Sequence, residues 1–323
     1  MANDVSFEAI TRAAAILRGV AHITPVMKSR QLDEKSGASV FLKCEHLQRT
    51  GSFKFRGAYH AASLVLSSGR SRTVTTISSG NHGQGLALAA KLLGLSAHVI
   101  VPKPASALKQ AAITSYGARL HLEETRSLAE ATMRQMIEDG QATPIHAFND
   151  PHVIAGQGTI MLELFKQVPA LDIVLAPIGG GGLLSGLCLA GHHLNPSLQI
   201  YGCEPRGAAD AIESLRLNYI VPMAAPQTMA DGLWTSLGNR TLPILRQHLT
   251  EVFLVDEEEI VAAMRFVYER MKLVIEPSSA VALAPVLRTE PALIGKRVGV
   301  VITGGNVDLE ALWKSLSPGA VPP

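Results

Sequence analysis

The stretch Ile173 to Gly186 reads Ile-Val-Leu-Ala-Pro-Ile-Gly-Gly-Gly-Gly-Leu-Leu-Ser-Gly and decides how the chain folds. An apolar run typical of a buried strand leads into four glycines, and an apolar stretch typical of a helix follows. Such a loop lets bare backbone N–H groups approach an anion at the positive end of the helix dipole. We expect a phosphate site here, although four glycines could also form only a tight turn.

The spacing of these glycines argues against two common nucleotide sites. They lack the GxGxxG pattern followed by an acidic residue, which is typical of a dinucleotide-binding fold. No Gly-Lys-Ser/Thr ends the loop, as it would in a P-loop.

Working outward, short β-branched or apolar runs alternate with longer helix-like stretches, which predicts an α/β protein with parallel sheets. Helices are expected at Gly83–Leu93 and Glu257–Met271, among others. The expected strands are Ser39–Lys43, Thr73–Ile77, Ala97–Val101, Arg119–Leu122, Ile145–Phe148, Ile173–Ala176, Gln199–Cys203, Glu251–Val255 and Val298–Thr303.

The alternation divides into two units. We expect residues 50–150 to form a small domain that covers an active-site cleft, and residues 1–49 and 151–323 to form a large domain. The segment Phe148–His152 is the expected crossover, because the residue before Pro151 is pushed away from helix. The Pro- and Gly-containing end, Ser317–Pro323, is expected to be disordered.

The composition describes an enzyme-sized globular chain without special partners. Its 323 residues are 47% hydrophobic and 17% charged, with a net charge of +2, so no basic field exists to attract nucleic acid. No window of about 18 apolar residues predicts a membrane span, and the N-terminus does not resemble a secretory signal. The three cysteines are widely spaced, which suits a reducing compartment. We expect a cytoplasmic protein.

Two further glycine-containing segments follow expected strands. Ser78-Ser79-Gly80-Asn81-His82-Gly83 is rich in hydrogen-bond donors and could bind a carboxylate at a helix N-terminus, or simply cap an ordinary helix. Thr303-Gly304-Gly305-Asn306 closes the last expected strand, where ligands gather in open α/β sheets.

A lysine lies in the stretch Thr50-Gly51-Ser52-Phe53-Lys54-Phe55-Arg56-Gly57-Ala58. Its aromatic and glycine neighbours permit a partly apolar environment for Lys54. Desolvation depresses the pKa of a lysine and makes its neutral amine available as a nucleophile. Most lysines, however, are solvated surface groups, and the neighbours alone do not exclude that.

These segments, in this order, resemble the serine/threonine dehydratase and serine racemase family of fold-type II pyridoxal-phosphate enzymes. The resemblance covers nearly the whole chain. It implies a tryptophan-synthase β-like fold, with two open twisted parallel sheets and helices on both faces.

The resemblance also implies roles for individual residues. Lys54 would carry pyridoxal 5'-phosphate as a Schiff base and later act as the base on the substrate Cα proton. Phe53 would lie against the pyridine ring, Asn81 would bind the phenolic oxygen, and Thr303 would lie next to the pyridine nitrogen. The phosphate would be held by the backbone of Gly179, Gly180, Gly181, Gly182 and Leu183, and the substrate carboxylate by Ser78, Ser79, Gly80, Asn81 and His82.

Two hydroxyl groups bear on the type of reaction. Thr303 cannot keep the ring nitrogen protonated as an aspartate would, which favours β-elimination. Ser79 matches a serine that in the racemases can move a proton on the opposite face of the substrate. It could equally well only donate a hydrogen bond to the carboxylate.

A divalent cation is also implied. Glu204, the carbonyl of Ala208 and Asp210 match the segment that binds a cation in the racemases, and such oxygen ligands suit Mg²⁺, Mn²⁺ or Ca²⁺. Without the resemblance, these would be two surface acids near a strand end.

Several positions depart from the racemase pattern or have open roles. An ungapped alignment puts Glu130 where a substrate-binding arginine is expected, and Arg126 fits only with a gap. Trp234 follows Ala-Asp-Gly where many relatives have a basic residue; it could line a substrate pocket or point into the core. Glu276 matches a glutamate near the cofactor and, if buried, should have a partner.

We therefore expect a homodimeric enzyme that converts L-serine or L-threonine to a 2-oxo acid and ammonia. The alternatives are a dehydratase for a larger or acidic substrate such as phenylserine or 3-hydroxyaspartate, or a serine racemase. A more remote alternative is a non-catalytic protein that binds a phosphorylated metabolite.

Overall fold

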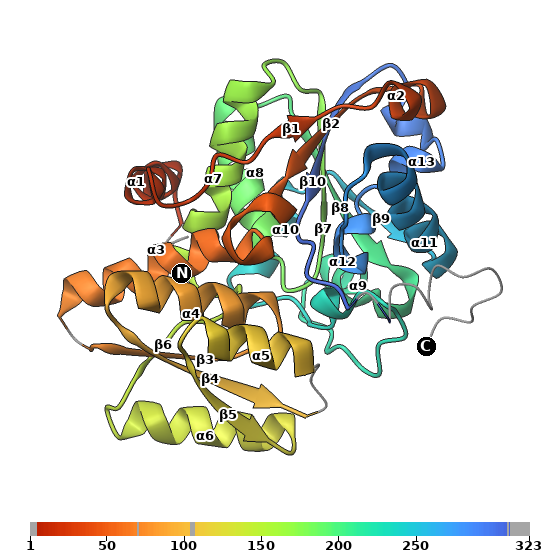
Figure 1. The fold of residues 1–323 in the computed structure, drawn as a ribbon. Helices are drawn as coiled ribbons and strands as arrows, with labels where there is room; N and C mark the ends of the chain where they lie inside the picture. The colour runs from red at the N-terminus through yellow and green to blue at the C-terminus, as the bar shows by residue number, and fades with distance from the viewer. Residues whose placement is uncertain (1–4, 70, 104–106, 309, 311–323) are drawn as a thin grey trace.

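Two sheets of mainly parallel strands organise the chain (Figure 1). The computed structural model describes residues 5–69, 71–103, 107–308 and 310. The larger sheet has the order β1 (Val26–Met27), β2 (Ser39–Cys44), β10 (Arg297–Ile302), β7 (Ile173–Pro177), β8 (Gln199–Pro205) and β9 (Glu251–Val255). The smaller sheet has the order β5 (Arg119–Glu123), β4 (Ser96–Pro102), β3 (Thr73–Ile77) and β6 (Thr143–Pro144).

Helices cover both faces of the large sheet. Along β7, Ile173 and Leu175 point into one hydrophobic cluster, while Val174 and Ala176 point into the other, as expected for a strand buried on both faces. The first cluster is closed by α2 (Arg30–Ser36), α11 (Glu257–Phe266), α12 (Pro277–Ala280) and α13 (Ala284–Leu287). The second is closed by α1 (Phe7–Leu17), α7 (Pro151–Gln167), α8 (Gly182–Leu194) and α10 (Thr241–His248).

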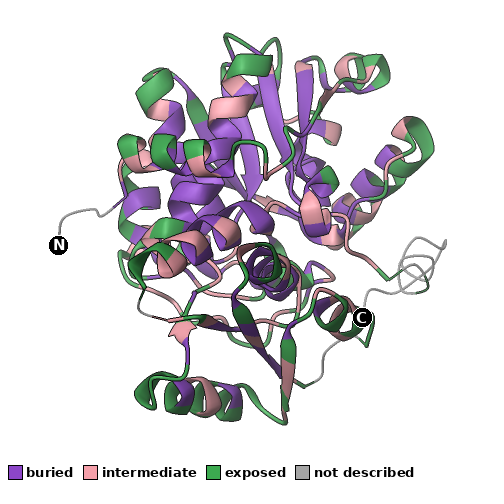
Figure 2. Ribbon diagram, turned by 60° about the vertical axis from the view of Figure 1, so that its left-hand side comes forward, coloured by how far each residue is buried: buried purple, intermediate pink, exposed green. Residues whose placement is uncertain are grey.

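The small sheet is covered unequally. A large apolar cluster joins one face to α3 (Lys54–Ser68), α4 (Asn81–Leu93) and α5 (Ala107–Ser115). On the other face, only α6 (Arg126–Glu138) packs on Ile100, through Ala129 and Met136. Figure 1 shows α6 on the side of this sheet opposite α4 and α5, and Figure 2 shows that exposed residues dominate the outer surface of α6.

Helix α3 joins the two sheets because it packs on both α4 and α7. The backbones of α3 and α7 nearly touch: a methyl group added to Gly156 would lie 2.6 Å from the Gly57 Cα atom. Only glycines permit this approach. As a result, the N-terminus of α3, where Lys54 lies, is held against the large sheet's helices.

The predicted fold class is confirmed, and most expected strands lie within a few residues of the observed ones. The four-stranded sheet lies wholly within residues 50–150 and the six-stranded sheet outside that range. Asp150 caps α7 with Pro151 in the first turn, which is the turn expected at Phe148–His152. The division into a large domain and a small domain that covers an active-site cleft stays a prediction.

The strand expected at Ile145–Phe148 was wrong. Strand β6 ends at Pro144, and the chain then turns, because the Nδ1 atom of His146 accepts the backbone N–H groups of Phe148 and Asn149 at 3.3 and 3.0 Å. This turn brings residues 146–148 into the cleft described below.

Some shorter elements were not expected. Strand β1 is too short to show a periodic pattern, and it pairs with β2 in the antiparallel sense. The helix expected at Glu257–Met271 is α-helical only to Phe266 and continues as the π-helix η5 (Val267–Met271). The remaining elements are α9 (Asp210–Leu217) and the 3₁₀ turns η1 (Glu45–Leu47), η2 (Arg49–Gly51), η3 (Arg206–Ala208), η4 (Asp231–Leu233) and η6 (Pro291–Leu293).

The remaining expectations concern the cysteines, the membrane and the chain end. Cys44, Cys188 and Cys203 are free and buried, as their spacing suggested. Among the described residues, no helix is long and apolar enough to cross a membrane. The segment Ser317–Pro323, expected to be disordered, lies outside the described residues.

Candidate functional site

A cavity of about 880 Å³ opens between the two sheets. Its walls come from the segments that follow the carboxyl ends of β3, β6, β7 and β10, together with η4 and one side of α6. Ligands of open α/β sheets bind at this edge, where successive loops diverge. The structure brings every predicted cofactor- and carboxylate-binding residue to this cavity: Phe53, Lys54, Ser78, Ser79, Gly80, Asn81, His82, Gly179, Gly180, Gly181, Gly182, Leu183 and Thr303.

Lys54 lies in the first turn of α3 and reaches into the cavity. Its Nζ atom donates a hydrogen bond to the carbonyl oxygen of Ala147, at 2.9 Å, and lies 5.1 Å from the centroid of the Phe53 ring. Burial lowers the pKa of Lys54 to about 8, and nearby Glu276 opposes the shift. The amine is thus easier to deprotonate than an ordinary lysine, as a nucleophile requires.

The glycine loop after β7 offers unused backbone donors. Within the described part of the chain, the N–H groups of residues 179–183 make no hydrogen bond to the protein. Gly181 has a φ of +82°, and a methyl group on Gly180 would lie 2.4 Å from the Phe148 ring, so side chains are excluded here. Unsatisfied N–H groups at the start of a helix are suited to bind a phosphate, and those at the start of α8 fit this requirement.

The start of α4 offers a second set of donors. The side chain of Ser78 accepts the N–H groups of Gly80 and Gly83, at 3.3 and 3.0 Å, and so caps the helix. Helix capping was one of the two roles expected for this segment. The backbone N–H groups of Ser79, Asn81 and His82 have no acceptor among the described residues. Capping and carboxylate binding are therefore compatible, because different groups serve them.

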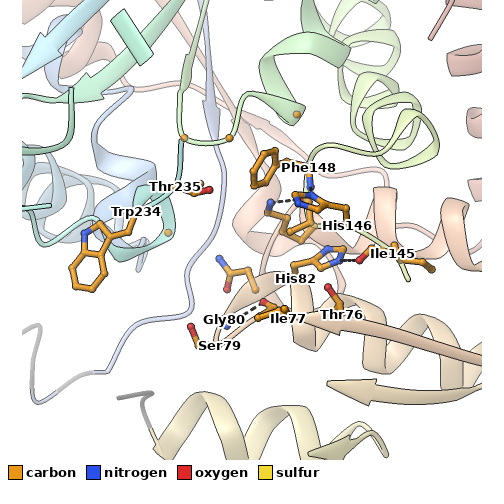
Figure 3. Close-up of a pocket in the computed structure, with 18 of the residues that line it drawn as sticks. Thr76, Ile77, Ser79, Gly80, His82, Ile145, His146, Phe148, Trp234 and Thr235 are labelled. Atoms are coloured by element: carbon orange, nitrogen blue, oxygen red, sulfur yellow. Dashed lines mark hydrogen bonds between the residues drawn. The ribbon is translucent and has the colours of Figure 1, made fainter. Parts of the chain in front are cut away.

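Two side chains of this segment point in different directions (Figure 3). Ser79 is exposed to the cleft, and its hydroxyl group makes no hydrogen bond to the described residues. His82 turns the other way, with Nε2 3.3 Å from the carbonyl oxygen of Ile145, and burial lowers its pKa to about 3. His82 is therefore a neutral group, and only its backbone N–H is available to an anion.

A chain of hydrogen bonds crosses the cavity floor from α4 to the loop after β10. The Nδ2 atom of Asn81 donates to both carboxylate oxygens of Glu276, at 2.8 and 3.0 Å, and Asn306 donates to the Asn81 oxygen at 2.8 Å. Glu276 is 4% exposed, and its burial raises its pKa to about 7. The expectation that a buried Glu276 has a partner is confirmed.

Thr303 directly follows β10 of the large sheet and lines the cavity. Its hydroxyl group lies 2.8 Å from that of Ser279, whose oxygen lies 2.7 Å from the Gly304 carbonyl oxygen and accepts the Gly304 N–H at 2.7 Å. Either hydroxyl group can be the donor in the contact between Thr303 and Ser279, since each carries one proton and two lone pairs. Sequence reasoning missed Ser279, since a serine beside Glu276 and Pro277 carries no distinctive pattern.

Charged groups line the opposite wall. Arg126 and Glu130 both face the cavity from α6, with Nε and Oε1 2.9 Å apart, although the alignment had left Arg126 in doubt. Lys109 pairs with Asp231 across the cleft. Arg134 also faces the cavity and has no ion pair within the described residues.

Trp234 and His146 complete this wall. Trp234 is 51% exposed and donates its Nε1 proton to the Thr228 carbonyl oxygen at 3.1 Å, so the interpretation that it points into the core was wrong. Desolvation and the charge of Lys54 lower the pKa of His146 to about 4. At neutral pH His146 is therefore uncharged.

The predicted metal ligands lie outside this cavity, at the end of β8. Both oxygens of the buried Asp210 have no partner, and the oxygens of Glu204 accept only the N–H groups of Ala211 and Ile212, at 2.8 and 3.1 Å. Burial raises the pKa of Asp210 to about 6 and that of Glu204 to about 8. Two buried carboxyl groups with free lone pairs fit a divalent cation. Within the described residues, no cluster of three or more His, Cys, Asp or Glu side chains exists.

The cavity fits a phosphorylated aldehyde such as pyridoxal phosphate. A lysine with a lowered pKa can bind the aldehyde, and the unused N–H groups of the glycine loop can bind the phosphate. Phe53 and Thr303 line the same cavity.

Comparison with known proteins also indicates a pyridoxal-phosphate enzyme. The family model described as "Pyridoxal-phosphate dependent enzyme" matches residues 17–304. The chain is 43% identical over 310 residues to an L-threo-3-hydroxyaspartate ammonia-lyase from Pseudomonas sp, covering 94% of this chain and 96% of that one.

Two solved structures are similar in sequence and fold. Serine racemase from Dictyostelium discoideum superposes with a TM-score of 0.90 at 42% identity, covering 94% of this chain and 99% of the other. A threonine deaminase from T.th. superposes with a TM-score of 0.89 at 41% identity, with the same coverage.

The buried carboxyl group of Glu276 predicts a change in the pH dependence of stability. Since its pKa is raised from 4.5 to about 7, the folded state favours the protonated form, and stability is lost as pH rises through this range. Glu276→Gln removes this loss. The free energy of unfolding of the variant, relative to the wild type, should rise by roughly 3 kcal/mol between pH 4.5 and pH 8. Urea unfolding of both proteins with equal cofactor content measures it, and a difference that is constant with pH would contradict the assignment.

Proposed function

Because the chain belongs to the family of pyridoxal-phosphate dependent enzymes, we propose that it eliminates water from 3-hydroxyaspartate and releases a 2-oxo acid and ammonia. A pyridoxal-phosphate enzyme of this group acts on hydroxy amino acids by β-elimination or racemisation. The acidic substrate, named above as an alternative, is better supported than L-serine or L-threonine.

The observation that carries the choice of substrate is Arg126 on the cavity wall. Arg126 lies close enough to His146 for its charge to lower the pKa of His146, and the charge of Lys54 lowers the same pKa. A second carboxylate on the substrate can exchange with Glu130 as the partner of Arg126, whereas serine and threonine have no group to place there. The activity named for the Pseudomonas relative supports the same choice.

The chain's own groups have distinct tasks in this reaction. Pyridoxal phosphate, when bound, supplies an electron sink for the charge that develops at the substrate Cα atom. The unused N–H groups of Ser79, Asn81 and His82 bind the α-carboxylate and so orient the Cα–H bond. The neutral amine of Lys54 removes that proton, since its pKa of about 8 lies close to physiological pH.

Other groups support the elimination. Glu276 and Asn306 hold the amide of Asn81 in one orientation. Thr303 presents a hydroxyl group and no carboxylate to the cavity, which favours loss of the β-hydroxyl group over longer-lived charge at Cα. We place residues 50–150 as the small domain that covers the substrate.

Racemisation of serine is a second candidate because of Ser79. Its hydroxyl group faces the cavity without a partner among the described residues, so it is free to move a proton on a second face of the substrate. The similar protein from Dictyostelium discoideum is named a serine racemase.

Replacing Arg126 tests the substrate assignment. For the wild type, kcat/KM for L-threo-3-hydroxyaspartate should exceed that for L-serine, L-threonine and phenylserine. Arg126→Gln should lower the value for 3-hydroxyaspartate roughly 10- to 100-fold, because charge-assisted hydrogen bonds are worth about 1.5–3 kcal/mol, and should leave the value for serine nearly unchanged. Formation of the 2-oxo acid measures both.

The matched control is Arg134→Gln, which removes a cation that also lines the cavity from α6 but does not contribute to the lowered pKa of His146. It should affect none of the substrates strongly. Equal losses in the two variants, or a wild type that prefers serine or threonine, would overturn the acidic substrate. Accumulation of D-serine without 2-oxo acid would favour the racemase.

We also propose a divalent cation at Glu204, Asp210 and the carbonyl of Ala208. Millimolar Mg²⁺ or Ca²⁺ should raise the Tm of the wild type by roughly 2–5 °C, since a ligand of the folded state stabilises it. Asp210→Asn should abolish the increase, and EDTA should reverse it. Glu213→Gln, which changes an exposed acid on the same helix, should retain it. An equal increase in the Asp210 variant would argue against the site.

A further inference from the structure

The largest fully buried side chains of the described chain, Arg56 and Lys43, belong to one network of charges. Arg56 donates from Nε and Nη2 to Glu45, at 2.7 and 2.9 Å, and from Nη1 and Nη2 to Glu163, at 2.7 and 2.9 Å. Lys43 donates to Glu163 at 2.8 Å and to the Thr24 carbonyl oxygen at 2.8 Å. The two cations and two carboxylates balance, and each is hydrogen-bonded.

A gain in the stability of the fold does not explain why the chain has such a network. Moving four charges out of water costs several kcal/mol for each ion, and apolar side chains of similar volume often stabilise a fold as well or better. The bidentate contacts of Arg56 instead fix the orientation of its side chain, because a planar guanidinium group between two carboxylates can rotate only a little.

The position of Arg56 on α3 connects the fixed orientation of its side chain to Lys54. It follows Lys54 by two residues on α3, and at 3.6 residues per turn the two side chains point to nearly opposite sides of the helix. Lys54 faces the cavity, while Arg56 is bound by η1 and α7, which are both attached to the large sheet.

Other contacts also hold the start of α3, where the side chain of Phe55 is fully buried in an apolar cluster. Its N-cap residue, Phe53, makes no side-chain capping bond. The backbone is fixed by the bond from Phe53 N–H to the Thr303 carbonyl oxygen, at 3.0 Å, and by Gln157, whose Oε1 accepts the Gly57 N–H at 3.2 Å. These contacts fix the position of the first turn, and the ion pairs of Arg56 with Glu45 and Glu163 add a restraint on its rotation.

We infer that Arg56 is a positioning residue for Lys54: its clamp between Glu45 and Glu163 sets the rotation of α3 that aims the amine at the cofactor and at the substrate Cα proton. The inference rests on the proposed function for its kinetic readout only. Attachment of pyridoxal phosphate to Lys54 tests it independently.

Arg56→Lys is the informative variant, because it keeps the positive charge but replaces the planar guanidinium group, which makes the bidentate contacts, by an ammonium group. We expect kcat to fall roughly 10- to 100-fold, the size of effect that a misplacement of about 1 Å can produce, with KM changed less than about threefold. The rate at which pyridoxal phosphate attaches covalently to the cofactor-free protein, followed by absorbance, should fall as well.

Lys43→Met is the matched control. It removes the other buried cation from Glu163. Lys43 makes no hydrogen bond or ion pair to a described residue of α3, so its loss should lower the Tm while leaving kcat and the attachment rate within about twofold of the wild type. If Arg56→Lys does not fold, Glu45→Gln replaces it, since Glu45 binds Arg56 and not Lys43 through its side chain.

The outcomes separate the two hypotheses. A slow attachment rate in Arg56→Lys but not in Lys43→Met supports the inference, even if the chain turns out to have another substrate. Normal attachment and kcat in Arg56→Lys, or equal losses in both variants, would overturn it and leave the network a purely structural feature. A failure of the proposed function alone would appear as normal attachment in the wild type without 2-oxo acid from any substrate.

Discussion

The amine of Lys54 lies in the cavity between the two sheets, half-buried and hydrogen-bonded to the carbonyl oxygen of Ala147. A lysine in this position is costly for the fold, since its ammonium form is poorly solvated and its pKa drops. That cost is useful to an enzyme that needs a neutral amine near physiological pH. The loops around the cavity are arranged so that an anion, an aromatic ring and a carboxylate can each be bound within reach of this amine.

Close approach of backbones makes this arrangement possible. Gly57 and Gly156 bring α3 against α7, and Gly186 brings α8 against the same helix, where a methyl group would lie 2.5 Å from the Ile154 carbonyl oxygen. Gly180 leaves room for the Phe148 ring. The helix that carries Lys54 and the helix whose N-terminus faces the phosphate site are thus fixed to one common support.

Much of the fold and site could be predicted because the signals are local. The strands of the large sheet are continuous apolar runs, and the glycine loop lies between a strand and a helix, so both are visible in short windows of sequence. The cavity residues after β3, β7 and β10 were found in the same way, with the resemblance to a known family assigning their roles.

Contacts between distant segments could not be predicted in this way. The pairing of Asn81 with Glu276 and Asn306 joins residues far apart in the chain, and nothing near Glu276 indicates its partner. Arg126 was uncertain because helix α6 reaches the cavity through its tertiary position and not through a motif. The turn at His146 replaced an expected strand because a side chain, and not the sheet, accepts the backbone N–H groups there.

The central claim is that Lys54 carries the cofactor, and a direct measurement can test it. The purified protein, saturated with pyridoxal phosphate, is reduced with borohydride and digested, and the masses of its lysine peptides are determined. The account predicts that the phosphopyridoxyl group is found on the peptide containing Lys54, and that Lys54→Ala abolishes this adduct. An adduct on another lysine, or none in the wild type, would contradict the account.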